Sequence, residues 1–112
     1  MMQRTVLPTA VAEGYITRYS LDMLDKIFSI TVETLRAGVA AQYEIAFLGL
    51  TRFALTDNAH ASWERLELTE VTIDHGPESS NDEEWEVRLN FWDVAELDIH
   101  CRTILVDGVA LL

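Results

Sequence analysis

Acidic side chains gather in one segment, between two stretches of alternating apolar residues. Asp74 precedes Glu78, and Asp82, Glu83 and Glu84 follow in a row. Carboxylates bind Ca²⁺ when they recur at defined spacing around a glycine and end in a bidentate acid. This order does not fit that spacing, and the segment is rich in Gly, Pro, Ser and Asn, which form turns. We expect a hydrated hairpin tip, with a docking surface for a basic partner as the alternative.

The candidate partner-binding residues are Glu78, Asp82, Glu83, Glu84 and Trp92. Trp92 is included because it has the opposite parity to Phe91, which lies on the apolar face of an alternating segment. We therefore expect its side chain to point outward or to lie at a turn. Exposed tryptophans are common where proteins bind partners.

Metal and thiol chemistry have few candidate residues. The histidines His60, His75 and His100 show no H-x-H or H-x-x-x-H spacing, and Cys101 is the only cysteine. Zinc needs three or four converging ligands, so the sequence predicts no metal site and no cofactor. Cys101 shares the parity of Ile99, which predicts a buried, unreactive thiol. No catalytic motif is present, so we expect no enzyme activity.

The charge of the chain limits its partners. Nineteen acidic residues against eight basic ones give a net charge of −11 over 112 residues. This field repels nucleic acids and anionic membranes, and it attracts basic proteins. The first residues are too short and too broken an apolar stretch for a signal peptide or a membrane span, so we expect a cytoplasmic protein.

Alternation of apolar and polar residues dominates the chain and predicts β-strands. The alternating segments are 15–23, 27–35, 42–55, 68–74, 85–91 and 97–106. Gly49 disturbs the third of them, which predicts one long bent strand or, as the variant, two shorter strands. A second bulge is expected near Arg102 or Thr103. Asp107-Gly108 is typical of a tight hairpin turn.

These segments predict a mainly β fold. We expect a single-domain antiparallel meander of six or seven strands, curled into a half-barrel or a two-layer sandwich. Residues 1–13 have no clear period, so we expect a loose N-terminal arm there and a single β domain over residues 14–112.

Four stretches carry a resemblance to a known group of proteins. They are "YSLDMLDKIFSITVET", "YEIAFLGLTRF", "WERLELTEVTI" and "AELDIHCRTILVDG". Their order resembles small uncharacterised bacterial β domains of the YxiG-like kind, over residues 15–108. The resemblance implies a compact β fold and no enzyme activity, and it assigns no functional residue. Some such small bacterial proteins are partners or antidotes in toxin systems.

Together these observations favour a non-catalytic acidic interaction module that binds a protein, of which an immunity-type inhibitor is one form. One alternative is a small-ligand-binding protein or enzyme that uses the interior of a curled sheet. Another is a homodimer that forms through an exposed strand edge.

Overall fold

The computed structural model describes residues 6–57, 66–75, 84–92 and 95–111 of the chain. These residues form one short helix and ten strands. In chain order they are α1 (Leu7–Val11), β1 (Tyr15–Asp22), β2 (Ile27–Arg36), β3 (Val39–Leu48), β4 (Arg52–Asp57), β5 (Leu66–Glu67), β6 (Glu70–His75), β7 (Trp85–Phe91), β8 (Ala95–Cys101), β9 (Thr103–Val106) and β10 (Val109–Ala110).

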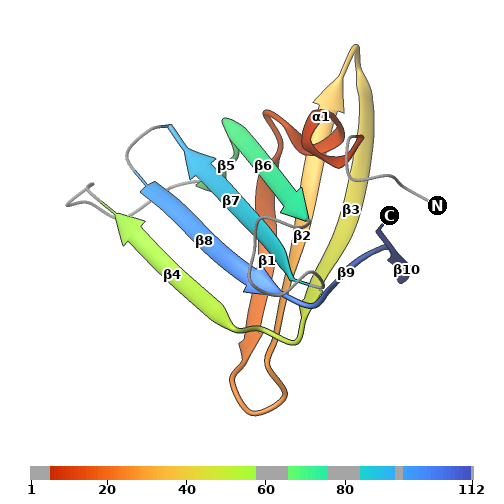
Figure 1. The fold of residues 1–112 in the computed structure, drawn as a ribbon. Helices are drawn as coiled ribbons and strands as arrows, with labels where there is room; N and C mark the ends of the chain where they lie inside the picture. The colour runs from red at the N-terminus through yellow and green to blue at the C-terminus, as the bar shows by residue number, and fades with distance from the viewer. Residues whose placement is uncertain (1–5, 58–65, 76–83, 93–94, 112) are drawn as a thin grey trace.

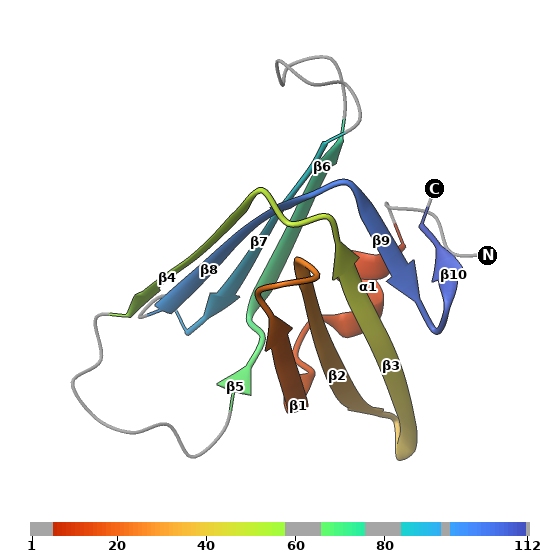
Figure 2. The same cartoon turned by 90° about the horizontal axis from the view of Figure 1, so that it is seen from below.

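The strands form two antiparallel sheets that lie face to face (Figures 1 and 2). One sheet has six strands in the order β10-β9-β3-β2-β1-β5, and the other has four in the order β4-β8-β7-β6. The prediction of a mainly β, antiparallel fold is confirmed, and of its two alternatives, a half-barrel and a two-layer sandwich, the structure has the two layers, which do not close into a barrel. The described residues hold ten strands rather than six or seven, because two predicted segments are divided and β5 and β10 are only two residues long.

The predicted disturbance at Gly49 is a point where the chain changes sheets. The segment 42–55 is divided into the end of β3, at Leu48, and β4, which begins at Arg52 in the other sheet. Gly49 has a φ of +69°, in the left-handed region that glycine adopts readily. The variant with two shorter strands is therefore correct for this segment.

The second predicted bulge is also a change of sheet. β8 ends at Cys101 and β9 begins at Thr103 in the six-stranded sheet. The two crossings lie side by side, because the Arg102 N–H donates to the Leu48 carbonyl at 2.9 Å. The Thr51 N–H likewise donates to the carbonyl of a β8 residue at 2.8 Å.

Two turns have the chemistry that their residues indicate. The Asp22 carboxylate accepts hydrogen bonds from the backbone N–H groups of Leu24 and Asp25, each at 3.0 Å, and so closes the turn between β1 and β2. Asp107 and Gly108 have φ values of 52° and 82° and join β9 to β10. Two successive positive φ angles are typical of a two-residue hairpin turn, so that prediction is confirmed.

The hydrophobic core lies between the two sheets. It is built from every second residue of the central strands, as the alternation predicts. Its members include Phe28, Ile30, Val32, Ile45 and Phe47 from the larger sheet, and Trp85, Val87, Leu89, Phe91, Leu97, Ile99 and Cys101 from the smaller one. The exposed fraction of each of these side chains is at most 6%.

The N-terminal segment differs from the predicted loose arm in its described part, residues 6–13. Residues Leu7–Val11 form α1, and Leu7 and Val11 belong to the core. The helix contacts β2 in one sheet and β6 in the other. The Arg36 guanidinium donates to the carbonyl of Ala12 at 2.7 Å and to that of Thr9. Five residues make less than two helical turns, so no 3.6-residue period is visible in the sequence.

None of the helical structure described reaches the length and apolar character of a membrane-spanning helix.

Candidate functional site

The outer face of the four-stranded sheet is polar, because its residues alternate with those of the core. Cross-strand pairing places Asp74, Glu86 and His100 in one row across β6, β7 and β8. The row ends at Arg52 on β4, which is opposite His100. A polar, partly exposed row of this kind is where side chains from separate strands can converge on one ligand.

Glu84, Glu86 and His100 form a cluster of potential metal ligands on this face, called the Glu84–Glu86–His100 cluster below. One ligand atom from each residue lies within 4.8 Å of the other two. Glu84 and Glu86 are two residues apart at the start of β7, so their side chains share a face. His100 is directly opposite Glu86 on β8. Glu84 and His100 are partly buried, whereas Glu86 is exposed.

Neighbouring groups hold the cluster in place. The Thr51 hydroxyl donates to the Glu84 carboxylate, and the Thr51 N–H donates to the His100 carbonyl at 2.8 Å. On the other side, Asp98 Oδ1 lies 3.4 Å from His100 Nε2, and Asp98 Oδ2 binds Arg52 Nε at 2.9 Å. Thr51 lies at the sheet crossing, so the crossing itself positions two members of the cluster.

Sequence reasoning did not find this cluster. No spacing in the sequence indicates it, because Glu86 and His100 belong to different strands, β7 and β8, and Glu84 precedes β7. The spacing of Glu84 and Glu86, two residues apart, did indicate that their side chains lie on the same face of a strand. The register of β7 against β8, which places His100 beside them, could not be read from the sequence.

The predicted partner-binding residues do not form one surface in the described structure. Glu78, Asp82 and Glu83 lie outside the described residues. Glu84 precedes β7 and Trp92 follows it, so the two lie at opposite ends of a seven-residue strand. At about 3.4 Å per residue, more than about 20 Å separates them. Trp92 is 59% exposed at the turn after β7, which confirms its predicted outward position.

The remaining candidates from the sequence are two histidines and Cys101. His60 lies outside the described residues, and the backbone of His75 belongs to β6. Cys101 is fully buried, as predicted. Burial raises the pKa of its thiol to about 12, and the nearby charge of Glu84 acts in the same direction.

The raised pKa of Cys101 predicts a loss of stability at high pH. The unfolded thiol titrates near its ordinary value of 9.0, whereas the folded thiol holds its proton up to about 12. The free energy of unfolding should therefore be unaffected by this group below about pH 9 and should fall as the pH rises toward 12, by about 1.4 kcal/mol per pH unit. Urea unfolding between pH 8 and 11 measures this slope.

The control for this experiment is Cys101→Ala, which keeps every other titrating group. Subtracting its slope from that of the unmodified protein leaves the contribution of the thiol. Equal slopes for the two proteins would show that Cys101 titrates alike in the folded and unfolded states.

A second surface, called the open side below, is an exposed apolar region where core-facing side chains of the two sheets are reached by solvent. It consists of Tyr19 and Leu21 on β1 and Phe53 and Leu55 on β4. By strand pairing all four belong to the core-facing side of their strands, yet their exposed fractions are 70%, 42%, 37% and 62%.

Two residues of the open side, one from each strand, adjoin Phe28. Leu21 pairs with Phe28, and the Phe53 ring meets the Phe28 ring edge-on with centroids 4.7 Å apart. Phe28 therefore lies beside residues of both β1 and β4. Helix α1 lies toward the Arg36 end of β2, whereas Phe28 is near the other end of that strand (Figure 1). The helix therefore packs against both sheets near one end of β2, and the open side lies toward the other end.

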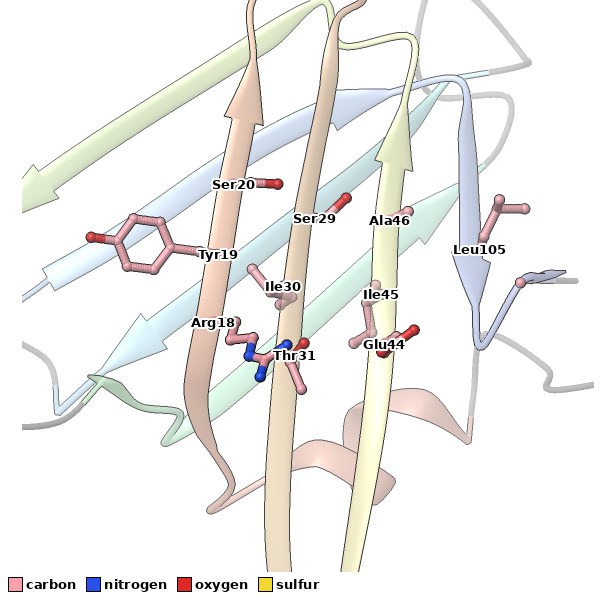
Figure 3. Close-up of a pocket in the computed structure, with 11 residues that line it drawn as sticks. Arg18, Tyr19, Ser20, Ser29, Ile30, Thr31, Glu44, Ile45, Ala46 and Leu105 are labelled. Atoms are coloured by element: carbon pink, nitrogen blue, oxygen red, sulfur yellow. The ribbon is translucent and has the colours of Figure 1, made fainter.

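A shallow groove of about 480 Å³ crosses β1, β2, β3 and β9 of the larger sheet (Figure 3). Its lining includes Arg18, Ser20, Ser29, Thr31, Glu44 and Ala46. Ser29 and Thr31 flank the buried Ile30, so they face away from the core. The groove is therefore on the outside of the sandwich. The small-ligand alternative requires a cavity in the interior, and it stays a prediction.

No protein-family model matches the chain, and the search of curated proteins found no match. The resemblance to YxiG-like β domains also stays a prediction.

Proposed function

We propose that the chain is a non-catalytic module that binds an extended segment of a basic protein along the edge of β4. The observation that carries this proposal is the open side, where Phe53 and Leu55 are exposed on the core-facing side of an edge strand. An added strand pairs its backbone with a free sheet edge and places alternate side chains on one face. Along β4, that face is the open side.

The edge of β4 is a better acceptor than the part of β1 that lies beyond its two-residue pairing with β5. β1 has a register shift between Ile16 and Arg18 and carries the Arg18 charge in mid-strand, two features that discourage strand addition. The central residues of β4, from Phe53 to Thr56, are uncharged. β4 is also the terminal strand of its sheet in the part of the chain that the structure describes.

The charge of the chain supports a basic partner. A net charge of −11 attracts positively charged proteins at long range and accelerates their association. An inhibitor that covers a basic surface of another protein, including the immunity type, is one form of such a module. A second copy of this chain carries the same negative charge, so self-association along β4 is the weaker alternative.

Leu55→Lys should weaken partner binding by about tenfold or more, because it places a charge where an apolar anchor packs. We would select peptides from a displayed library of extended sequences and measure their dissociation constants by fluorescence anisotropy. Selected peptides should alternate apolar and basic residues. Their affinity should fall as the salt concentration rises.

The matched control is Leu35→Lys. Leu35 is a leucine of similar exposure, 69% against 62%, near the end of β2 and away from the open side. The two variants have the same net charge, so a difference between them reports the location of binding. The proposal is wrong if no peptide is enriched, or if the selected peptides bind both variants equally well.

A further inference from the structure

We propose that Glu84, Glu86 and His100 bind one divalent transition-metal cation, and that Zn²⁺ matches the ligand set best. The cluster supplies two carboxylates and one imidazole, with ligand atoms within 4.8 Å of one another. Carboxylate and imidazole ligands bind Zn²⁺ at about 2.0–2.2 Å. Ligand atoms around one ion at these distances lie about 3–4 Å apart, so small side-chain rotations bring the three groups onto a single ion.

The histidine separates this cluster from the rest of the acidic surface. Imidazole nitrogen suits Zn²⁺ and the neighbouring transition metals, whereas Ca²⁺ and Mg²⁺ take oxygen ligands. The cluster should therefore prefer Zn²⁺ over both alkaline-earth ions. General attraction of cations to a chain of charge −11 would not give that preference.

The groups around the cluster have the arrangement that metal ligands commonly require. A metal-bound histidine usually directs its other ring nitrogen at a carboxylate, and metal-bound carboxylates accept further hydrogen bonds. Asp98 Oδ1 lies 3.4 Å from His100 Nε2, and the Thr51 hydroxyl donates to Glu84. Asp98 is itself held by Arg52.

The cluster also has a rigid base and an accessible side. Glu86 and His100 are paired residues of two central strands, so their backbones are fixed by the sheet. Glu86 is exposed, which gives an ion a path from solvent. Three protein ligands leave a fourth position of a tetrahedral zinc ion open to water or to a donor from another molecule. Cys101 does not compete for the ion, because its side chain lies in the core.

The test uses the full chain without an affinity tag, freed of metal with a chelator that is then removed. Isothermal titration with Zn²⁺ should give one ion per chain, and Ca²⁺ and Mg²⁺ should bind at least about tenfold more weakly. Loss of a group that merely supports a metal ligand costs about 10- to 100-fold in affinity. Glu84→Gln, Glu86→Gln and His100→Gln should therefore each weaken Zn²⁺ binding by at least tenfold, and Thr51→Val by about tenfold.

The matched control is Glu70→Gln, which removes the same charge from the same sheet. Glu70 pairs with Asn90, four residues along β7 from Glu86, so it lies about 13 Å from the cluster along the strand. The affinity of the Glu70→Gln variant for Zn²⁺ should stay within twofold of that of the unmodified protein. Cu²⁺, a paramagnetic ion that imidazole ligands suit, should broaden the amide NMR signals of residues 51, 84, 86 and 100 before those of other acidic segments.

Three results would overturn the proposal. One is Zn²⁺ binding that His100→Gln leaves unchanged, which would place the ion elsewhere. Another is equal loss in Glu86→Gln and Glu70→Gln, which would reveal only attraction to the negative surface. The third is Cu²⁺ broadening that begins at other acids, such as Asp22 and Asp25. The variant Leu55→Lys should bind Zn²⁺ normally, so this proposal and the docking of a partner along β4 are tested separately.

Discussion

Phe47→Ala should lower the free energy of unfolding by about 3–5 kcal/mol. The Phe47 side chain is 2% exposed, and its ring stacks on Phe28 with centroids 5.9 Å apart. Truncation removes the buried apolar area and leaves a cavity that the flanking strands cannot fill. Because domains of this size are stable by only about 5–15 kcal/mol, the loss should be visible as a large shift of the urea midpoint.

Phe53→Ala is the matched control for that experiment. It deletes the same atoms from a phenylalanine that also contacts Phe28 but is 37% exposed at the open side. The loss of stability should be clearly smaller, because less area returns to water and no closed cavity forms. Equal losses would mean that the Phe47 side chain is no more buried than that of Phe53.

Leu7→Ala should lower the free energy of unfolding by about 2–5 kcal/mol. Leu7 is 2% exposed and belongs to the core cluster, although it lies in a helix of only five residues. Helix α1 contacts a strand of each sheet, so its apolar side chains contribute to the packing between the layers. Chemical denaturation of the purified variant measures the effect.

Val6→Ala is the neighbouring control. Val6 precedes the helix and is 50% exposed, so its truncation should change the stability by no more than about 0.5 kcal/mol. If Leu7→Ala and Val6→Ala have equal effects, the N-terminal segment contributes nothing to the core, as the sequence alone suggested.

The strands with strict alternation were predictable from the sequence. In β2, β7 and β8 every second side chain is buried, and the apolar residues Phe28, Val87 and Leu97 have the parity that the pattern requires. A one-residue slip would turn these side chains to solvent, so burial fixes the register. The hairpin at Asp107-Gly108 was predictable for a local reason, because both residues tolerate positive φ.

The exposure of the edge strands was not predictable. Phe53 and Leu55 alternate like core residues, and nothing in their pattern indicates that β4 lies at a sheet edge. Gly49 could be recognised as a disturbance, but a bulge within one sheet and a crossing between two sheets disturb the period alike. Only the pairing of β4 with β8 distinguishes them.

The candidate metal cluster was missed for a related reason. The proximity of His100 to Glu84 and Glu86 depends on the register between two strands and on a third residue, Thr51, from the crossing. Such long-range relations leave no mark at fixed spacing in the sequence. Helix α1 was missed because a single short helix has no room for a period.

The pairing of β9 with β3 has a consequence for how the chain acquires its shape. Ile45 pairs with Val106, so the larger sheet gains its fifth and sixth strands from residues synthesised about sixty positions after β3. Until those residues emerge from the ribosome, the edge of β3 that pairs with β9 has no strand partner, and its backbone N–H and C=O groups are unpaired. Contacts between such distant residues also slow folding, because a long loop must close before they form. A chain that has formed β2 and β3 but not yet β9 therefore has an unpaired strand edge, which favours aggregation, and pairing with β9 removes that edge.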